Sequence, residues 1–183
     1  LVTPAIEARL SKALGRMTEL QLDSLEDHVV VLGYSGDTSP IADELRERSE
    51  FVVLTPDDDV ASRLRERGTM TVTANPSNES ALERARVEKA RAVVAATDDD
   101  ADDALAVLTA RQMNPDVRIV VSAADEGNVH KLRRAGADTV ISPASIVGDL
   151  LVESALTGED TGTVADEVLR EGLEDDEEGD GAE

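Results

Sequence analysis

The 183-residue chain contains no cysteine and no tryptophan, and aromatic residues make up 1% of it. The absence of cysteine excludes disulfide bonds, thiol nucleophiles and cysteine-based zinc sites. Basic residues are also scarce, because 18 Lys and Arg accompany 40 Asp and Glu for a formal net charge of -22. Lys and Arg are what bind the phosphate backbone, so this charge argues against a nucleic-acid partner. No apolar run approaches the roughly 18 residues that a membrane span requires.

The acidic residues are spread along the whole chain, and only three of the basic residues are lysines: Lys12, Lys89 and Lys131. This pattern is typical of proteins that work at very high salt, where screening weakens the repulsion between like charges. The sequence therefore predicts a halophilic protein. The alternative is an acidic protein encoded by a GC-rich genome.

The middle of the chain alternates short, β-branched apolar runs with helical patterns. The predicted strands are Val29–Leu32, Phe51–Leu54, Thr69–Thr73, Arg91–Ala96, Arg118–Val121 and Thr139–Ile141. The predicted helices are Pro40–Arg48, Asp58–Arg67, Glu79–Ala85, Asp100–Gln112, Glu126–Ala135 and Ala144–Leu156. Apolar strands that alternate with helices indicate an α/β fold with a parallel sheet buried on both faces. We expect a Rossmann-like, doubly wound sheet of six strands in the order 3-2-1-4-5-6.

Three segments follow from this pattern. Residues 1–27 carry apolar positions every three to four residues and are predicted to form a helical linker. Residues 28–157 form the Rossmann-like domain. Residues 158–183 are rich in acid and poor in apolar side chains, which predicts a disordered tail.

A glycine-containing turn follows the first predicted strand and opens the first predicted helix of the domain. It reads Gly33, Tyr34, Ser35, Gly36, Asp37 and Thr38. In dinucleotide-binding folds such a turn presents backbone N–H groups and a helix N-terminus to a phosphate. The usual spacing is G-x-G-x-x-G. Here Gly33 is in register, whereas Ser35 and Thr38 replace the second and third glycines.

The end of the second predicted strand is where such folds place an acid that holds the ribose hydroxyls. This chain has Thr55, Pro56 and Asp57 there, with the acid two residues late. No arginine is present to accept a 2′-phosphate, which disfavours NADP. Two interpretations stay open: a cleft that binds NAD or another adenine nucleotide, and a degenerate cleft kept for packing and assembly.

Longer motifs resemble the RCK domain, the regulator of potassium conductance. The run from His28 to Tyr34 is similar to the start of that domain, and Ala74-Asn75-Pro76-Ser77 stands where the family carries Gly-Asp-x-Thr. The segment Ala90–Ala95, with Asp98–Asp100 after it, is similar to the fourth strand and acidic turn of the family. The most specific block is Leu132–Asp138 with Val140–Pro143, which is similar to Leu-Arg-x-Ala-Gly-Ala-Asp followed by Val-Ile-Ser-Pro.

The resemblance implies a set of ligand positions. The turn from Gly33 to Thr38 would border phosphate, Thr55 would lie at the ribose, and Asn75 and Pro76 at the adenine. Ala96, Thr97 and Asp98 would line the other edge of the cleft. Asn75 replaces the usual aspartate, so the ligand preference is expected to be altered or lost. Calcium-gated relatives carry carboxylates after the fourth and fifth strands, where this chain has Ala96, Ser122 and Ala124, so no metal site is expected.

The resemblance also implies a role. RCK domains dimerise through their last helices and form cytoplasmic rings that gate a pore, so we expect a dimer or ring through Ile146–Leu156. The alternative for this helix is ordinary packing on the sheet. Residues 1–27 resemble the linker that joins a pore helix to an RCK domain, which implies an upstream transmembrane pore module. The domain would then lie on the cytoplasmic side of the plasma membrane.

Two other roles stay open: an assembly module that binds no ligand, and a soluble subunit of a Trk-type potassium uptake system. Enzyme activity is not expected, because the sequence offers no nucleophile with an acid–base pair. Of the two histidines, His28 is predicted to be structural and His130 to lie on the surface.

Overall fold

The computed structural model describes residues 21–33 and 39–157 of the chain. The predicted helix in residues 1–20, the turn from Tyr34 to Thr38 and the predicted acidic tail lie outside these residues. No helix in the described part is long and apolar enough to span a membrane.

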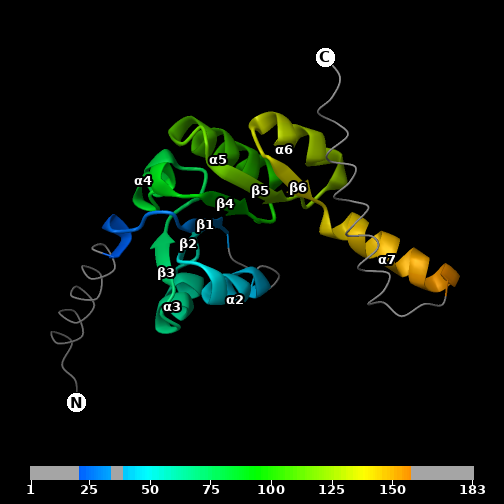
Figure 1. Cartoon of the computed structure of the whole chain (residues 1–183), viewed down its shortest axis with the longest axis horizontal. Coiled ribbons are helices and arrows are strands. Elements are labelled where there is room, and N and C mark those ends of the chain that lie inside the picture. Colours follow the sequence, from blue (N-terminus) through cyan, green and yellow to red (C-terminus); the bar gives the residue numbers. More distant parts are fainter. Residues whose placement is uncertain (1–20, 34–38, 158–183) are drawn as a thin grey trace.

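A six-stranded parallel sheet forms the centre of the domain (Figure 1). Its strands are β1 (Val29–Leu32), β2 (Phe51–Thr55), β3 (Met70–Thr73), β4 (Ala92–Ala95), β5 (Arg118–Ser122) and β6 (Thr139–Ile141). They lie in the order β3-β2-β1-β4-β5-β6, which confirms the predicted topology. β1 is central and pairs in parallel with both β2 and β4.

Helices cover both faces of the sheet (Figure 1). They are α2 (Ser39–Arg48), α3 (Asp58–Glu66), α4 (Glu79–Arg84), α5 (Asp100–Met113), α6 (Val129–Ala135) and α7 (Pro143–Thr157), with single 3-10 turns at Val87–Lys89 and Glu126–Asn128. α2 and α3 lie on one face, and α4, α5 and α6 on the other. Each predicted helix is present within one residue of its expected bounds, except that Glu126–Ala135 divides into a 3-10 turn and α6.

Successive side chains of β1 point alternately into the two hydrophobic cores, one on each face of the sheet. Val30 and Leu32 face the larger core under α4, α5 and α6, whereas Val29 and Val31 face the smaller core under α2 and α3. All four are buried, as expected of a parallel strand covered on both faces. The apolar side chains that predicted this strand therefore pack against the helices on both faces of the sheet.

The segment before β1 is anchored on the body rather than detached from it. Leu22 and Leu25 are buried in the larger core. The Asp27 N–H donates to the Lys89 carbonyl oxygen over 2.9 Å, and the Arg86 guanidinium donates to the Asp23 carbonyl oxygen. The end of the predicted linker is thus fixed against the turn that precedes β4.

The two histidines occupy the expected environments. His28 is fully buried, and its Nε2 lies 2.9 Å from the carbonyl oxygen of Ala85, to which the ring donates a hydrogen bond. This bond ties the start of β1 to the end of α4. His130 is exposed on α6.

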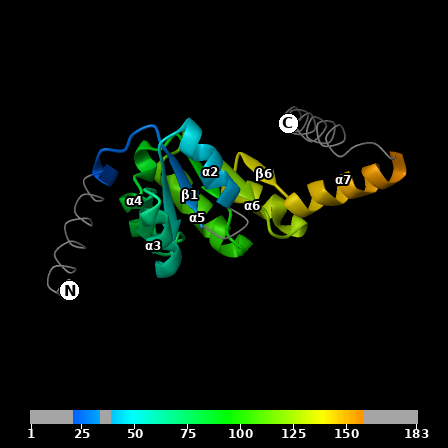
Figure 2. The same cartoon turned by 90° about the horizontal axis from the view of Figure 1, so that it is seen from below.

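The last helix, α7, extends away from the body (Figures 1 and 2). None of its residues is buried, and its exposed apolar side chains are Val147, Leu151, Val152 and Leu156. Ordinary packing on the sheet, the alternative interpretation of this helix, is therefore wrong for the described residues.

Candidate functional site

A cavity of about 310 Å³ opens at the edge of the sheet where the carboxyl ends of the strands meet, called the carboxyl edge below. Residues following β1, β2, β3 and β4 all contribute to its lining. The strand order reverses between β1 and β4, and doubly wound sheets bind ligands at that point. The position and size of the cavity are those of a small-molecule site.

The structure brings nine of the predicted site residues together around this cavity. They are Gly33, Thr55, Pro56, Asp57, Asn75, Pro76, Ala96, Thr97 and Asp98. The other five, Tyr34, Ser35, Gly36, Asp37 and Thr38, lie outside the described residues. Contact with a ligand stays a prediction for all fourteen residues. The cavity is also lined by Asp99, Asp102 and Asp103, which are not among the fourteen predicted residues.

Gly33 lies where β1 ends, and two independent features require glycine there. Its φ is +80°, in the left-handed region that L side chains rarely adopt. A Cβ atom added at this position would lie 2.6 Å from Cγ2 of Thr97 and 3.3 Å from the Ala96 carbonyl oxygen. The backbone of Gly33 is therefore in close contact with Ala96 and Thr97 after β4.

Two of the predicted site residues, Asp57 and Asn75, have their side chains engaged in local hydrogen bonds. The Asp57 carboxylate caps α3, because Oδ1 accepts the N–H groups of Asp59 and Val60, each over 2.9 Å. Oδ1 of Asn75 accepts the Ser77 N–H over 2.9 Å and the Ser77 hydroxyl over 2.7 Å. Both side chains shape the rim of the cavity while they stabilise the turns that carry them.

Thr97 and Asp103 form a hydrogen-bonded pair in the wall opposite these turns. The Thr97 N–H donates to Oδ2 of Asp103 over 3.2 Å, and the Thr97 hydroxyl donates to Oδ1 over 2.9 Å. Asp103 is 1% exposed, and burial raises the pKa of its carboxyl to about 6 despite the two hydrogen bonds from Thr97. The neighbouring carboxylates of Asp100 and Asp102 raise the pKa further.

Asp100 lies about one helical turn before Asp103 on α5, and its pKa is shifted in the opposite direction. Burial raises its pKa, but hydrogen bonds from the Asn128 side chain and from the backbone N–H groups of Ala124 and Asp125 outweigh burial and leave the pKa lowered. These bonds measure 2.8, 2.8 and 3.0 Å. The carboxylate therefore fastens the loop after β5 to the start of α5.

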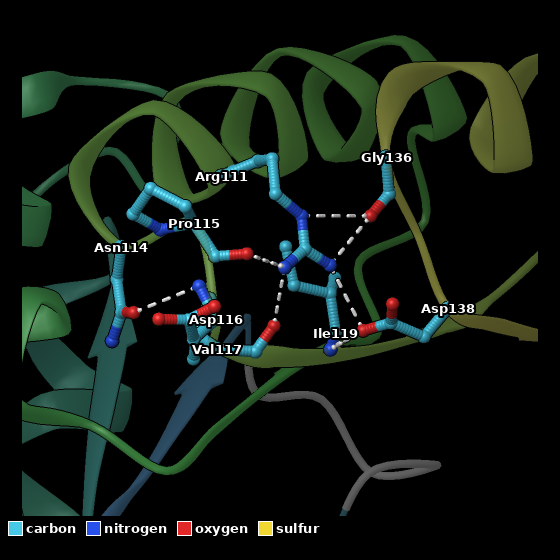
Figure 3. Close-up of polar contacts among 8 residues, drawn as sticks. All are labelled: Arg111, Asn114, Pro115, Asp116, Val117, Ile119, Gly136 and Asp138. Atoms are coloured by element: carbon cyan, nitrogen blue, oxygen red, sulfur yellow. Dashed lines mark hydrogen bonds and ion pairs between the residues drawn. The ribbon is translucent and has the colours of Figure 1, made fainter.

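The most specific sequence block, Leu132–Asp138, serves the fold rather than the cavity. Figure 3 shows the Arg111 guanidinium reaching from α5 to the carbonyl oxygens of Pro115, Val117 and Gly136 and to the Asp138 carboxylate. The same Asp138 oxygen accepts the Ile119 N–H over 2.6 Å. Gly136 ends α6 with φ +115°, which lets the chain turn into β6. One arginine thereby joins α5, the start of β5 and the turn before β6.

A doubly wound parallel sheet, a glycine of positive φ after its central first strand and a cavity at the reversal of strand order define the class of Rossmann-type dinucleotide-binding domains. The chain belongs to the TrkA-N domain family, whose sequence model matches residues 29–143. The predicted relationship to RCK domains is thereby confirmed.

Relatives of known name include potassium channels. The chain is 28% identical over 137 residues to "Probable potassium channel protein 2" of Methanocaldococcus jannaschii, and the match covers 73% of this chain and 40% of that protein. It is 31% identical over 140 residues to the "Voltage-gated potassium channel Kch" of Escherichia coli strain K12, with 74% and 33% covered. The matched part therefore spans between a third and two fifths of these relatives.

Solved structures agree with the sequence matches. The structure described as "GsuK channel bound to NAD" superimposes with a TM-score of 0.63 at 28% identity and covers 70% of this chain and 23% of that chain. The structure described as "GsuK bound to ADP" superimposes with a TM-score of 0.65 at 25% identity, with 81% and 42% covered.

Proposed function

We propose that this chain is the cytoplasmic gating domain of a potassium channel or potassium-transport protein, and that its cavity senses an adenine nucleotide such as NAD. The role is regulatory rather than enzymatic. The names of the relatives support potassium transport, and the NAD and ADP complexes of a similar channel support the ligand class.

The observation that carries the ligand proposal is the contact between Gly33 and Thr97. Gly33 at the end of β1 and Thr97 after β4 line the same cavity, and they lie so close that no Cβ atom at position 33 would fit between them. A ligand bound between these segments meets both sides of the strand reversal at once. Binding would therefore be communicated to α5, whose first turn holds Thr97 through Asp103.

Isothermal titration with NAD, NADH, ATP, ADP and AMP in molar KCl tests the proposal. We expect saturable binding of at least one of these nucleotides, with one site per chain. The absence of heat with all five would refute nucleotide sensing and favour the assembly module that binds no ligand. Molar KCl is used because the chain is predicted to be halophilic.

We further propose that α7 is the surface through which two copies associate. Leu151 and Leu156 are 66% and 78% exposed, and no residue of this helix is buried. A second copy would bury these apolar side chains, which favours association by about 25 cal/mol for each Å² removed from water.

Replacement of Leu151 and Leu156 by Glu tests this surface, since Glu keeps a high helix propensity and opposes burial. Sedimentation equilibrium is expected to show a dimer or larger ring for the parent chain and monomers for the variant. The matched control changes Asp149 and Glu153 of the same helix to Asn and Gln and is expected to leave the assembly intact. An unchanged mass in the Glu variant would refute this interface.

The sequence of the full gene distinguishes a potassium channel from a soluble subunit of a Trk-type uptake system. Two apolar segments flanking a filter-like loop, encoded upstream in the same reading frame, would support the channel interpretation. Their absence from the full gene would favour the soluble subunit.

A further inference from the structure

The cavity at the carboxyl edge has an unusual charge for a site proposed to take a nucleotide. Five of its twelve lining residues are aspartates: Asp57, Asp98, Asp99, Asp102 and Asp103. Among the described lining residues there is no Lys or Arg. Phosphate groups entering the cavity therefore meet carboxylates and no lining side chain of opposite charge.

Two of these aspartates cap helix N-termini, which are places where an anion can bind. Asp57 caps the N-terminus of α3, and Oδ1 of Asp99 caps the N-terminus of α5 by accepting the N–H groups of Ala101 and Asp102 over 2.9 and 3.2 Å. Helix N-termini attract anions through the N–H groups of the first turn and the positive end of the helix dipole. In this cavity, two such ends are already satisfied by the chain's own carboxylates.

Asp98 and Asp102 differ from the other three. Asp57, Asp99 and Asp103 each accept hydrogen bonds that stabilise a helix end or the Thr97 turn. Both Asp98 and Asp102 are exposed, and within residues 21–33 and 39–157 neither carboxylate has an assigned hydrogen bond or ion pair. Among the described residues they contribute negative charge to the cavity and no side-chain hydrogen bond or ion pair.

We propose that this cavity selects its ligand by charge, with Asp98 and Asp102 as the specificity-determining residues that favour nucleotides of low negative charge. The inference rests on the proposed nucleotide binding and deepens it. NAD⁺ is preferred over NADH, which carries one more negative charge because reduction neutralises the nicotinamide ring. AMP is preferred over ATP for the same reason.

The same electrostatics reverses the usual effect of salt. In a site lined by Lys or Arg, ions screen an attraction and weaken nucleotide binding. Here they screen a repulsion, and the screening length falls from about 10 Å at 0.1 M salt to about 3 Å at 1 M. Binding therefore strengthens with KCl, and the gain grows with the negative charge of the ligand. The site is therefore expected to bind nucleotides most tightly at high salt.

Titrations of the full chain with NAD⁺, NADH, AMP and ATP test the proposal, in EDTA and at low and molar KCl. We expect NAD⁺ to bind about three- to tenfold more tightly than NADH at low salt, and the ratio to approach about one at molar salt. The Asp98→Asn/Asp102→Asn double variant is expected to reduce the low-salt ratio to within about twofold by strengthening the binding of NADH.

The matched control is Glu66→Gln/Asp116→Asn, which removes two carboxylates from the opposite edge of the sheet. Both residues are exposed, and neither lines the cavity. The control is expected to keep the NAD⁺ preference of the parent chain, which separates local repulsion from the net charge of -22.

The outcomes distinguish this inference from the function on which it rests. If no nucleotide binds under any condition, nucleotide sensing itself fails. If nucleotides bind but bind more weakly at molar KCl, or if NADH and ATP bind more tightly than NAD⁺ and AMP at low salt, charge selection is overturned and sensing stands. Equal ratios in the Asp98/Asp102 variant and the parent chain would likewise overturn the role of these two residues.

Discussion

Replacement of Asp103 by Asn gives a sharp test of the electrostatics of the cavity, because the carboxyl is buried in its wall. Its two oxygens accept hydrogen bonds from the N–H and the hydroxyl of Thr97. Burial raises the pKa of this carboxyl from 3.8 to about 6. The folded state therefore holds the proton more tightly than the unfolded state does, and ionisation at neutral pH costs stability.

The pH window follows from these two values. The stabilising contribution of the protonated carboxyl is complete below pH 3.8 and is lost as the pH rises through about 6. Above pH 7 the loss corresponds to about 2–3 kcal/mol of unfolding free energy. Asn cannot ionise, but the NH2 group that replaces one carboxylate oxygen cannot accept a hydrogen bond from Thr97, at a cost of about 1 kcal/mol. We expect Asp103→Asn to be about 1–2 kcal/mol more stable than the parent chain at pH 7.5.

Urea unfolding followed by circular dichroism, at constant KCl between pH 4 and 8, measures this difference. The stability gain of Asp103→Asn should be absent near pH 4, grow to pH 7 and stay constant above it. Asp116→Asn is the control, because this carboxylate is exposed and is not among the groups that raise the pKa of Asp103, so its effect should not follow this course. A constant difference between Asp103→Asn and the parent chain at every pH would refute the reasoning.

Three further predictions concern the scaffold around the site. Gly33→Ala should destabilise the domain by about 2–4 kcal/mol. Thr97→Ser in the same chain should restore part of this loss, because it removes the Cγ2 methyl group. Equal stability of the single and double variants in urea unfolding would contradict the contact. Arg111→Lys should lower stability by about 2–4 kcal/mol in thermal unfolding, because Lys cannot satisfy the same carbonyl groups, whereas Arg118→Lys on an exposed side chain should change little. Leu25→Ala should cost about 2–4 kcal/mol by opening a cavity in the larger core, and a loss below 0.5 kcal/mol would show that the segment before β1 is not anchored there.

The fold was predictable because each strand carries its own local signal. Runs such as Val29–Leu32 and Phe51–Leu54 are apolar at every position, which is typical of a parallel strand covered on both faces. The right-handed crossover rule then leaves the observed strand order as the default. The position of the cavity follows as well, since parallel strands bring their carboxyl ends to one edge.

The remaining part of the site depends on contacts that leave no local pattern. Asp103 reaches the cavity because one turn of α5 returns it beneath Thr97, so its role depends on helix geometry rather than on the acidic run itself. The signal that could have found it is the spacing of four residues from Asp99, the residue that caps α5. Arg111 joins carbonyl groups up to 25 residues away, and backbone acceptors are the same in every sequence. The role of Leu132–Asp138 could therefore be seen only in three dimensions.

The detached position of α7 has a thermodynamic consequence. A single helix of 15 residues is only marginally stable in water, because its nucleation is costly and too few turns follow to offset it. If two copies associate through α7 as proposed, its helical order is coupled to that contact and by mass action depends on protein concentration. Under that proposal, dilution unwinds this last segment before it disturbs the sheet.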